Sequence, residues 1–274
     1  MERIINIKGQ KPGKIVSVLV GVHGNERCGI EALEELLPGL FIESGEVYFI
    51  YGNPRAIDVG TRFVDVNLNR MFRDEKDLTD IERQSYERSR ALEVMKYLDK
   101  SDVSLDVHSS ATPNSTPFII CEPHAEDIVS RLDFSIRSTG WDFFEPGGTD
   151  FYMNKIGKTG ICIECGFHED PEAKELAKKA INDFLIINGL ISGVMPEKKN
   201  QSLVQLSSVY KTKVNFTPVR NFFDFEPLRA GELIGIDGNE EVCAPNVDNT
   251  LILFCRVRRG VGEEAFLTGA AKTV

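Results

Sequence analysis

Apolar residues along most of the chain follow two alternating spacings. Continuous β-branched and apolar runs are typical of strands buried on both faces of a sheet, and they occupy 14–22, 46–51, 103–107, 118–121 and 160–165. Between them, apolar residues three or four positions apart predict helices over 27–37 and 78–98, and a further helix that begins at Asp170-Pro171. Strands that alternate with helices predict an α/β sheet with both faces covered.

The apolar spacing within the predicted helices also indicates which side chains are buried. In the helix over 78–98 we expect Leu92, Met95 and Leu98 on the inner face. In the helix after Asp170, the inner face should carry Leu176, Ala180, Ile181, Phe184 and Leu185. The segment 53–72 is polar and contains Pro and Arg, so we expect neither a helix nor a strand there.

The pattern changes at the polar segment 196–201. After it, only short strand-like runs separated by turn residues remain, at 203–206, 231–236, 242–244 and 250–257. We therefore expect two domains, an α/β domain over 1–196 and a small all-β domain over 197–274.

Composition narrows the classes of protein. The chain has 274 residues, of which 42% are hydrophobic and 27% charged, so it can bury a core and is neither disordered nor fibrous. Thirty-two basic against forty-two acidic residues, with no basic block, is a poor match to a nucleic-acid backbone. The amino terminus lacks a signal-peptide core, and no apolar run reaches the ~18 residues of a membrane span. We expect a cytoplasmic protein without a nucleic-acid or membrane partner.

Six scattered cysteines are typical of reduced, packed thiols. Cys162 and Cys165 form a C-x-x-C motif within the predicted strand 160–165. Successive strand residues point to opposite faces, so these two thiols should point apart. This geometry argues against a redox or zinc role for the pair.

Two of the four histidines stand at the ends of predicted strands, where ligands gather in open α/β sheets. His23 and Glu26 lie three residues apart at a strand-to-helix turn, and His108 ends the strand 103–107. Together they supply a His₂Glu set of the kind that binds a catalytic zinc ion. Alternatively, His23 is a surface histidine beside a glutamate that begins a helix, and His108 is a histidine held by hydrogen bonds at the end of a strand.

Two carboxylates accompany this set. Asp106 shares a strand face with His108 and could orient its ring, or it is a strand-edge carboxylate. Glu164 stands within an apolar strand, where a carboxylate is costly unless paired or functional. It could serve as the base for a metal-activated water, or form a buried salt bridge with an arginine.

The segment after the second predicted strand offers Arg55, Arg62, Asn69 and Arg70 in a chain with excess negative charge. Arginines bind carboxylates bidentately, and one of them could instead stabilise an oxyanion. A solvated loop paired with nearby acids is the alternative. If the cluster is functional, the substrate is a small anion.

These motifs resemble the succinylglutamate desuccinylase/aspartoacylase family, a branch of the zinc carboxypeptidase fold. The resemblance rests on GVHGNE at 21–26, GNPRA at 52–56, DVNLNRMF at 65–72, DVHSS at 106–110, ICIECG at 161–166 and EEAF at 263–266. It implies a mixed sheet flanked by helices, with the small β domain capping the active-site mouth. It also implies that family members hydrolyse the amide of an N-acyl amino acid, releasing a carboxylic acid and the amino acid.

By this resemblance, His23, Glu26 and His108 would bind one zinc ion per chain. Glu164 would be the general base, and Arg62 would polarise the scissile carbonyl. Asn69 and Arg70 would bind a substrate carboxylate. The resemblance therefore predicts a zinc-dependent amidohydrolase acting on a small anionic N-acyl amino acid. The alternatives are a zinc carboxypeptidase and a non-catalytic binding module. Whether the protein forms a homo-oligomer is left open.

Two positions depart from the aspartoacylase pattern. Asn154 stands where those enzymes have a further arginine, and Gly260-Val261-Gly262 stands where they have a tyrosine. N-acetylaspartate is therefore a doubtful substrate. Lys155 or Lys158 could supply a replacement cation, or both are surface lysines. His124 and His168 match no ligand position.

Overall fold

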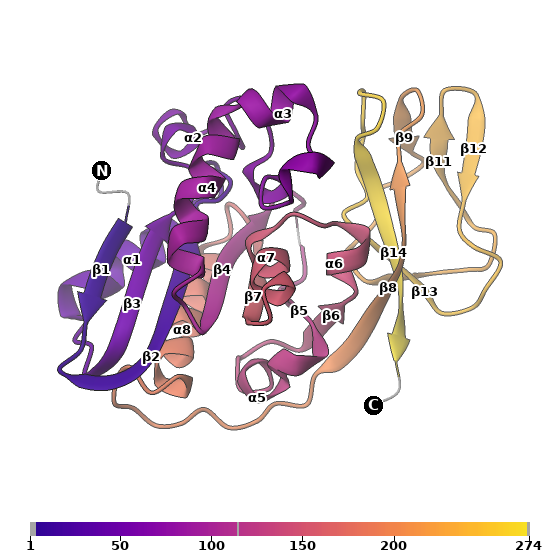
Figure 1. The fold of residues 1–274 in the computed structure, drawn as a ribbon. Helices are drawn as coiled ribbons and strands as arrows, with labels where there is room; N and C mark the ends of the chain where they lie inside the picture. The colour runs from indigo at the N-terminus through magenta and orange to yellow at the C-terminus, as the bar shows by residue number, and fades with distance from the viewer. Residues whose placement is uncertain (1–3, 114, 273–274) are drawn as a thin grey trace.

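The computed structural model describes residues 4–113 and 115–272 (Figure 1). Its helices are α1 (Arg27–Leu36), α2 (Pro54–Val59), α3 (Asp80–Gln84), α4 (Tyr86–Leu98), α5 (Glu126–Val129), α6 (Trp141–Phe144), α7 (Thr149–Lys155) and α8 (Pro171–Ile187). Its strands are β1 (Ile4–Lys8), β2 (Lys11–Val20), β3 (Ser44–Tyr51), β4 (Val103–Ser110), β5 (Phe118–Cys121), β6 (Ile136–Thr139), β7 (Thr159–Phe167), β8 (Ser202–Lys211), β9 (Phe216–Pro218), β10 (Glu226–Leu228), β11 (Leu233–Asp237), β12 (Glu240–Cys243), β13 (Thr250–Leu253) and β14 (Glu264–Lys272).

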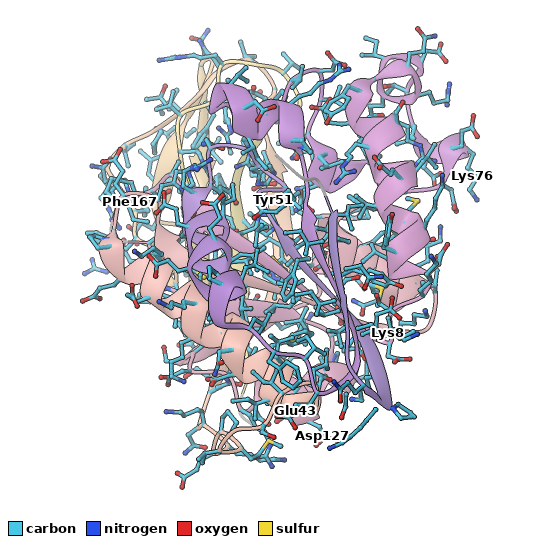
Figure 2. The ribbon with its side chains drawn as sticks, turned by 90° about the vertical axis from the view of Figure 1, so that its left-hand side faces the viewer. Lys8, Glu43, Tyr51, Lys76, Asp127 and Phe167 are labelled. Carbon is cyan, nitrogen blue, oxygen red and sulfur yellow. The ribbon has the colours of Figure 1, made fainter. Side chains whose placement is uncertain are left out.

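Within these residues eleven strands form one mixed sheet, in the order β1-β3-β2-β4-β7-β5-β6-β8-β14-β13-β10. Strands β3, β2, β4 and β7 run parallel, so their carboxyl ends meet at one edge, whereas β1 and β5 run antiparallel to their neighbours β3 and β7. In Figure 2, Tyr51 and Phe167, the last residues of β3 and β7, lie at the same end of the molecule, and Glu43 lies at the other. The predicted α/β fold class is confirmed.

Both faces of the parallel strands are apolar because helices cover each of them. Figure 1 shows α4 and α7 in front of these strands and α1 and α8 behind them. Val16, Val18 and Val20 of β2 pack in the cluster formed with α1 and α8, and Leu19 packs on the opposite face with α4 and α7. Burying each such side chain contributes about 1.5–3 kcal/mol to folding. The period of two along the strand therefore places successive residues in different cores.

The predicted helix over 78–98 is two helices, so that prediction is wrong in part. Thr79 begins α3 with a capping box to Glu82, and Ser85, in extended conformation, ends α3 and caps α4 by accepting a hydrogen bond from the Arg88 amide. The break changes which face is inner. Leu92 has 47% of its surface exposed, contrary to prediction, whereas Leu98 is buried and Met95 packs against the core.

The polar segment 53–72 is more regular than predicted. It begins with α2, for which the Asn53 side chain accepts a hydrogen bond from the Ala56 amide and Pro54 supplies the first helical residue. Gly60, with a φ of +68°, ends the helix in the left-handed conformation. Local capping chemistry thus forms a short helix without an apolar stripe.

The residues after 197 form strands, as predicted. Strands β8, β14, β13 and β10 extend the main sheet, because β8 pairs with β6 in parallel. Strands β12, β11 and β9 form a separate antiparallel sheet. Whether 1–196 and 197–274 are separate domains stays a prediction.

Two smaller predictions can be compared with the structure. Cys162 and Cys165 pack in different hydrophobic clusters, on opposite faces of β7, and both thiols are free. No helix in the described part of the chain is both long and apolar enough to cross a membrane.

Candidate active site

Three buried side chains that can bind a metal ion converge near the carboxyl ends of β2 and β4. His23 follows β2 after a turn at Gly21, whose φ of +64° favours glycine. Glu26 precedes α1 directly, and His108 lies in β4, the parallel neighbour of β2. The possible ligand atoms of the three residues all lie within 4.8 Å of one another. The structure therefore brings together the His₂Glu set that the sequence predicts.

The Glu26 carboxylate lies between the two rings. Its Oε1 is 2.7 Å from His23 Nδ1, and its Oε2 is 2.9 Å from His108 Nδ1. Burial alone would raise the pKa of Glu26, but His23 and His108 hold it well below its usual range. Burial and the nearby Arg62 lower the pKa of His23 to about 4. Burial alone would lower the pKa of His108, but Asp106 and Glu26 raise it well above its usual range. Because an ionised carboxylate and a neutral imidazole are the forms that bind metals, Glu26 and His23 already have the required form, and metal binding at His108 would release a proton.

Each histidine is also oriented through its second ring nitrogen. His108 Nε2 lies 3.2 Å from Asp106 Oδ2, which in turn accepts a hydrogen bond of 2.6 Å from the Thr149 hydroxyl. His23 Nε2 lies 2.9 Å from Asn67 Oδ1. Asn67 stands in the same motif as Asn69 and Arg70, but no pattern in the sequence distinguished it as a site residue. Contacts of this kind fix the ring orientation of metal ligands.

Glu164 occupies the position in β7 directly beside His108 in β4. Burial first, and then the charge of Glu26, raises the pKa of Glu164 to about 8. Its Oε2 is buried without a hydrogen-bond partner among the described residues, and no arginine forms an ion pair with it there. The charge of Arg62 acts on Glu164, but Arg62 forms its ion pair with Glu26, so the described residues show no salt bridge at Glu164 and leave its Oε2 without a partner.

These side chains open into one cavity of about 540 Å³. Its lining includes the three possible ligands, Glu164, Arg62, Asn69 and Arg70, together with Lys211, Arg256, Arg258, Glu263 and Glu264 from the C-terminal strands and loops. The C-terminal segment thus forms a wall of the site.

The predicted basic residues differ in their surroundings. Arg62 donates a hydrogen bond of 3.0 Å to Glu26, and its side chain is 43% exposed. Arg70 pairs with Glu145 and approaches Glu264 at 3.5 Å. Arg55 does not reach the cavity: it is exposed on α2 and stacks over the ring of a neighbouring tyrosine at 4.3 Å. Its role in substrate binding has no support in this geometry.

Comparisons with known proteins all point to one family. Residues 12–184 match the model of the succinylglutamate desuccinylase/aspartoacylase catalytic domain. The chain belongs to this family. A succinylglutamate desuccinylase from Pseudoalteromonas atlantica is 30% identical over 94% of this chain and 81% of its own length, and one from Shewanella woodyi is 39% identical over 93% and 81%. A solved succinylglutamate desuccinylase from Vibrio cholerae, 19% identical, shares the fold with a TM-score of 0.80 over 98% of this chain and 85% of that one. The chain is therefore a hydrolase of this family, as predicted.

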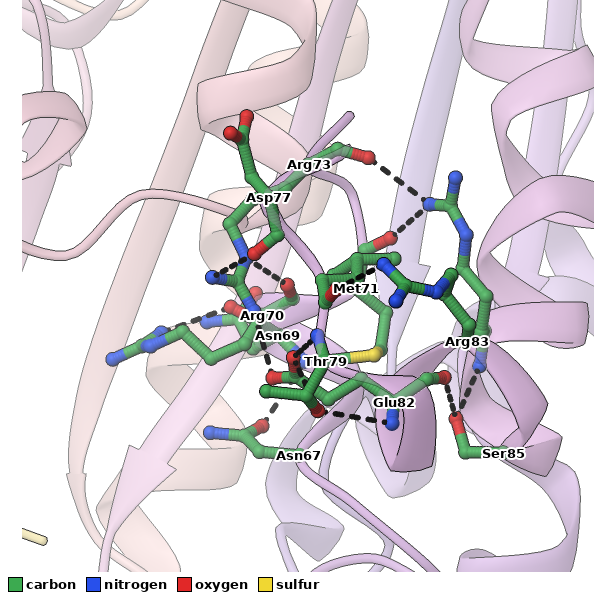
Figure 3. Close-up of polar contacts among 12 residues, drawn as sticks. Asn67, Asn69, Arg70, Met71, Arg73, Asp77, Thr79, Glu82, Arg83 and Ser85 are labelled. Atoms are coloured by element: carbon green, nitrogen blue, oxygen red, sulfur yellow. Dashed lines mark hydrogen bonds and ion pairs between the residues drawn. The ribbon is translucent and has the colours of Figure 1, made fainter. Parts of the chain in front are cut away.

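The family motif DVNLNRMF leads into a segment that its own side chains hold in place (Figure 3). Arg73 donates to the Arg70 carbonyl at 2.8 Å, to the Asp77 carbonyl at 3.1 Å and to the Glu82 carboxylate at 2.7 Å. Glu82 also accepts from the Thr79 amide, which completes the capping box of α3. These bonds tie the loop that carries Asn69 and Arg70 to the start of α3.

A buried carboxylate supports the other half of this loop. Glu87 of α4 accepts hydrogen bonds from the amides of Val64, Asp65 and Val66 at 2.7–3.2 Å, and from the Asn53 side chain at 3.1 Å. Val64, Asp65 and Val66 lie between Arg62 and Asn67 in the chain, so Glu87 supports the backbone that carries both side chains.

We expect Glu87→Ala to lower the free energy of unfolding by about 3–5 kcal/mol, because one buried and three partly buried donors lose their charged acceptor at once. Urea denaturation of wild type and variant measures the difference. Glu34→Ala, which replaces an exposed glutamate of α1, is the matched control. Equal midpoints for wild type and Glu87→Ala would contradict this role.

Of the two departures from the aspartoacylase pattern, Asn154 lies outside the cavity, whereas Gly262 of the second lines it. Asn154 accepts from the Gly160 amide and donates to Asp142, each at 3.0 Å. Lys155 pairs with an aspartate at 2.5 Å, and Lys158 donates to backbone carbonyls. Neither lysine lines the cavity, which favours the surface alternative for both.

The remaining histidines are not metal ligands in this geometry. His124 contacts the Lys158 carbonyl at 3.2 Å, away from the site. His168 lies 2.9 Å from the hydroxyl of Ser109, the residue after His108. His168 therefore contacts the neighbour of a possible ligand but does not join the group around Glu26.

Proposed function

We propose that this chain is a zinc-dependent amidohydrolase that removes the acyl group from a small N-acyl amino acid. The observation that carries the proposal is the buried group of His23, Glu26 and His108 with an unpaired Glu164 beside it in one cavity. The relatives named above as succinylglutamate desuccinylases support the choice of substrate class. A solved relative, the product-bound ectoine utilization protein from Ruegeria pomeroyi, shares the fold at 19% identity.

The donor set fits a zinc ion. Two imidazole nitrogens and one carboxylate oxygen leave a fourth position open in a tetrahedral site, as catalytic zinc requires. His23, Glu26 and His108 would hold the ion. When bound, zinc polarises a carbonyl group and makes water more acidic.

The other residues would carry the protons and the charge. Glu164 would take a proton from the attacking water and pass it to the leaving amine, a role that suits a carboxyl group with a raised pKa. Arg62, beside Glu26, would stabilise the negative charge that develops on the scissile carbonyl oxygen. Asn69, whose Oδ1 is buried without a partner in the described structure, and Arg70 would contact a substrate carboxylate.

The C-terminal segment favours a small substrate over a peptide. Because residues of 211–264 form a wall of the cavity, they limit the length of chain that can enter. We therefore prefer a deacylase to a zinc carboxypeptidase, with 1–196 as the catalytic domain and 197–274 as a cap over the active-site mouth.

A hydrolysis screen tests the proposal. Purified protein is loaded with Zn²⁺ and given N-acetyl, N-succinyl and N-formyl amino acids, with a chelator-treated sample as control. We expect release of the amino acid from at least one of these substrates and loss of that activity with the chelator. Faster cleavage of blocked dipeptides would favour a carboxypeptidase, and protein that binds no zinc would favour a binding module.

A further inference from the structure

Beside the candidate base, the face of the sheet that lines the cavity changes from polar to apolar. Glu164 of β7 pairs with His108 of β4 on one side and with Phe118 of β5 on the other. Paired residues of neighbouring strands point to the same face of a sheet, so these three side chains lie in one row. Ile120, two positions after Phe118, points to this face too and lines the cavity. The possible metal ligand, the base and an apolar surface therefore follow one another across the sheet.

Aromatic rings from other segments of the chain pack around Phe118. The centre of its ring lies 6.1 Å from that of Trp141, 4.9 Å from that of Phe225 and 5.9 Å from that of Phe254. Trp141 and Phe254 also contact each other edge to face, with their ring centres 6.1 Å apart. Four apolar side chains of this cluster line the active-site cavity, and we call them the apolar patch: Ile120, Trp141, Phe144 and Phe254. Cavity walls of this kind favour a ligand that has an apolar part.

The polar groups of the patch already have partners within the protein. The indole nitrogen of Trp141 donates to the Ser138 hydroxyl at 2.9 Å, and the Phe254 amide donates to Asp224 Oδ1 at 2.7 Å. Asp224 is itself buried, and its Oδ2 accepts from the Ser115 hydroxyl at 2.5 Å. Neither N–H group is left to donate to a ligand, so the patch presents carbon atoms to the cavity.

The backbone of Phe254 is held in a strained conformation. Its φ is +54°, in the left-handed region that bulky residues with a Cβ atom disfavour. Phe225, the residue after Asp224, has a φ of +65°. Strained residues persist where their surroundings hold them, and they cluster at ligand-binding sites. Because the Asp224 carboxylate holds the Phe254 amide in this conformation, Asp224 positions the Phe254 ring in the patch.

Charged side chains line other parts of the same cavity, among them Arg62, Arg70, Asp150 and Arg256. Arg256 Cζ lies 5.6 Å from the centre of the Phe254 ring, so the apolar and charged parts meet there. A ligand that fills the whole cavity must therefore combine polar groups with a carbon chain. An N-acyl amino acid with a single carboxylate has this division, because its carboxylate and amide are polar and its acyl chain and side chain are not.

We propose that the apolar patch is a subsite for an apolar group of the substrate, and that Asp224 positions this subsite through Phe254. The proposal rests on the deacylase function proposed above and names its substrate class: an N-acyl amino acid with one carboxylate and one apolar substituent. The substituent belongs either to the acyl group or to the amino acid side chain. Burying one CH₂ group against apolar surface strengthens binding about fourfold, so a few carbon atoms give a measurable preference.

The test uses three substrates of equal charge. N-acetylalanine is the reference, N-pentanoylalanine adds three carbon atoms to the acyl group, and N-acetylleucine adds three carbon atoms to the side chain. We expect the zinc-loaded wild type to cleave at least one of the larger substrates with a kcat/KM roughly 10- to 60-fold above that of the reference. The preferred substrate identifies the substituent that occupies the patch. A wild type that cleaves neither larger substrate better than the reference overturns the proposal.

Phe254→Gly removes the ring but keeps a residue that adopts the left-handed conformation freely. This variant should lose most of the preference for the larger substrate. Phe225→Gly is the matched control, because Phe225 has the same conformation and packs in the same cluster but does not line the cavity. It should keep the wild-type preference. Melting temperatures show which variants fold, and Phe254→Asn replaces Phe254→Gly if the latter does not, since asparagine also tolerates this conformation. A folded Phe254 variant with the wild-type preference overturns the subsite.

Two variants of Asp224 test its positioning role. Asp224→Ala leaves the Phe254 amide without an acceptor, so it should reduce the preference, through a higher KM for the larger substrate more than through kcat. Asp224→Asn should restore part of the preference, because its amide oxygen can still accept from the Phe254 amide. Equal preferences in wild type and Asp224→Ala contradict the positioning role.

Calorimetry with the two kinds of product, which have no amide to cleave, separates this proposal from the deacylase function. The zinc-loaded wild type should bind pentanoate more tightly than acetate, or leucine more tightly than alanine, by about 10-fold or more. Phe254→Gly should lose this difference. Equal affinities within both pairs overturn the subsite, whereas the expected difference without hydrolysis of any acyl amino acid contradicts only the proposed reaction.

Discussion

Replacing Glu164 by glutamine should abolish hydrolysis while the protein still binds zinc. Glutamine has nearly the same shape as glutamate but accepts no proton, so the water loses its base and the leaving amine loses its acid. Removing one such group costs about 10²–10⁴-fold in rate, and Glu164 would act twice in each turnover. We therefore expect a loss in kcat of at least about 10³-fold.

The measurement pairs kinetics with metal analysis of the same preparation. Zinc content should stay at one ion per chain, because the predicted ligands are His23, Glu26 and His108. The fold should also persist, because Glu164 Oε2 has no hydrogen-bond partner to lose within the described residues. Glu122→Gln is a matched control: Glu122 follows β5, is half-buried with a raised pKa and lies outside this cavity. Near-normal turnover by Glu164→Gln would show that another group is the base.

The position of Glu164 shows how much of the site was predictable from sequence. A carboxylate within an apolar strand stands out because burying its charge is unfavourable unless it has a partner or a function. The apolar runs before His23 and His108 indicate that both residues lie at strand ends. Parallel strands then place these ends side by side, as the pairing of His108 with Glu164 shows. Local pattern and general topology were enough for this part.

The wall that faces these residues was not predictable in the same way. Arg70 pairs with Glu145 and Glu264, which are 75 and 194 residues away in the chain. Such partners depend on how the C-terminal strands join the sheet, and strands as short as β6, with only four residues, gave no usable period. Sequence reasoning therefore found Arg70 but missed its neutralisation, and it overlooked Arg256 and Arg258.

The errors in the helices have a local cause. An apolar spacing that continues from 78 to 98 conceals the capping chemistry of Ser85, which stops one helix and starts the next. The restart rotates the buried face toward Ala91, Val94 and Leu98, and leaves Leu92 in solvent. The polar capping residues, rather than the apolar ones, decided the boundary.

Glu26→Ala should remove the metal and, with it, the activity. Glu26 would supply the oxygen ligand, and its carboxylate also accepts hydrogen bonds from Arg62 and from the Ser109 amide. Without it, His23 and His108 lose the group that lies between their Nδ1 atoms. Loss of an orienting group outside the ligand set already costs 10–100-fold in metal affinity, so a lost ligand should cost more than about 100-fold.

Competition with a chromophoric chelator measures this affinity, and the screen substrates measure the activity. Asp106→Asn provides a graded comparison: it keeps all three ligands but weakens the contact that orients His108, so affinity should fall by roughly 10–100-fold. His124→Ala, a histidine outside the site, should change neither quantity. If three ligands and an oriented His108 ring hold the ion, zinc affinity should fall from wild type to Asp106→Asn and fall further in Glu26→Ala. Wild-type zinc affinity in Glu26→Ala would place the metal elsewhere in the chain.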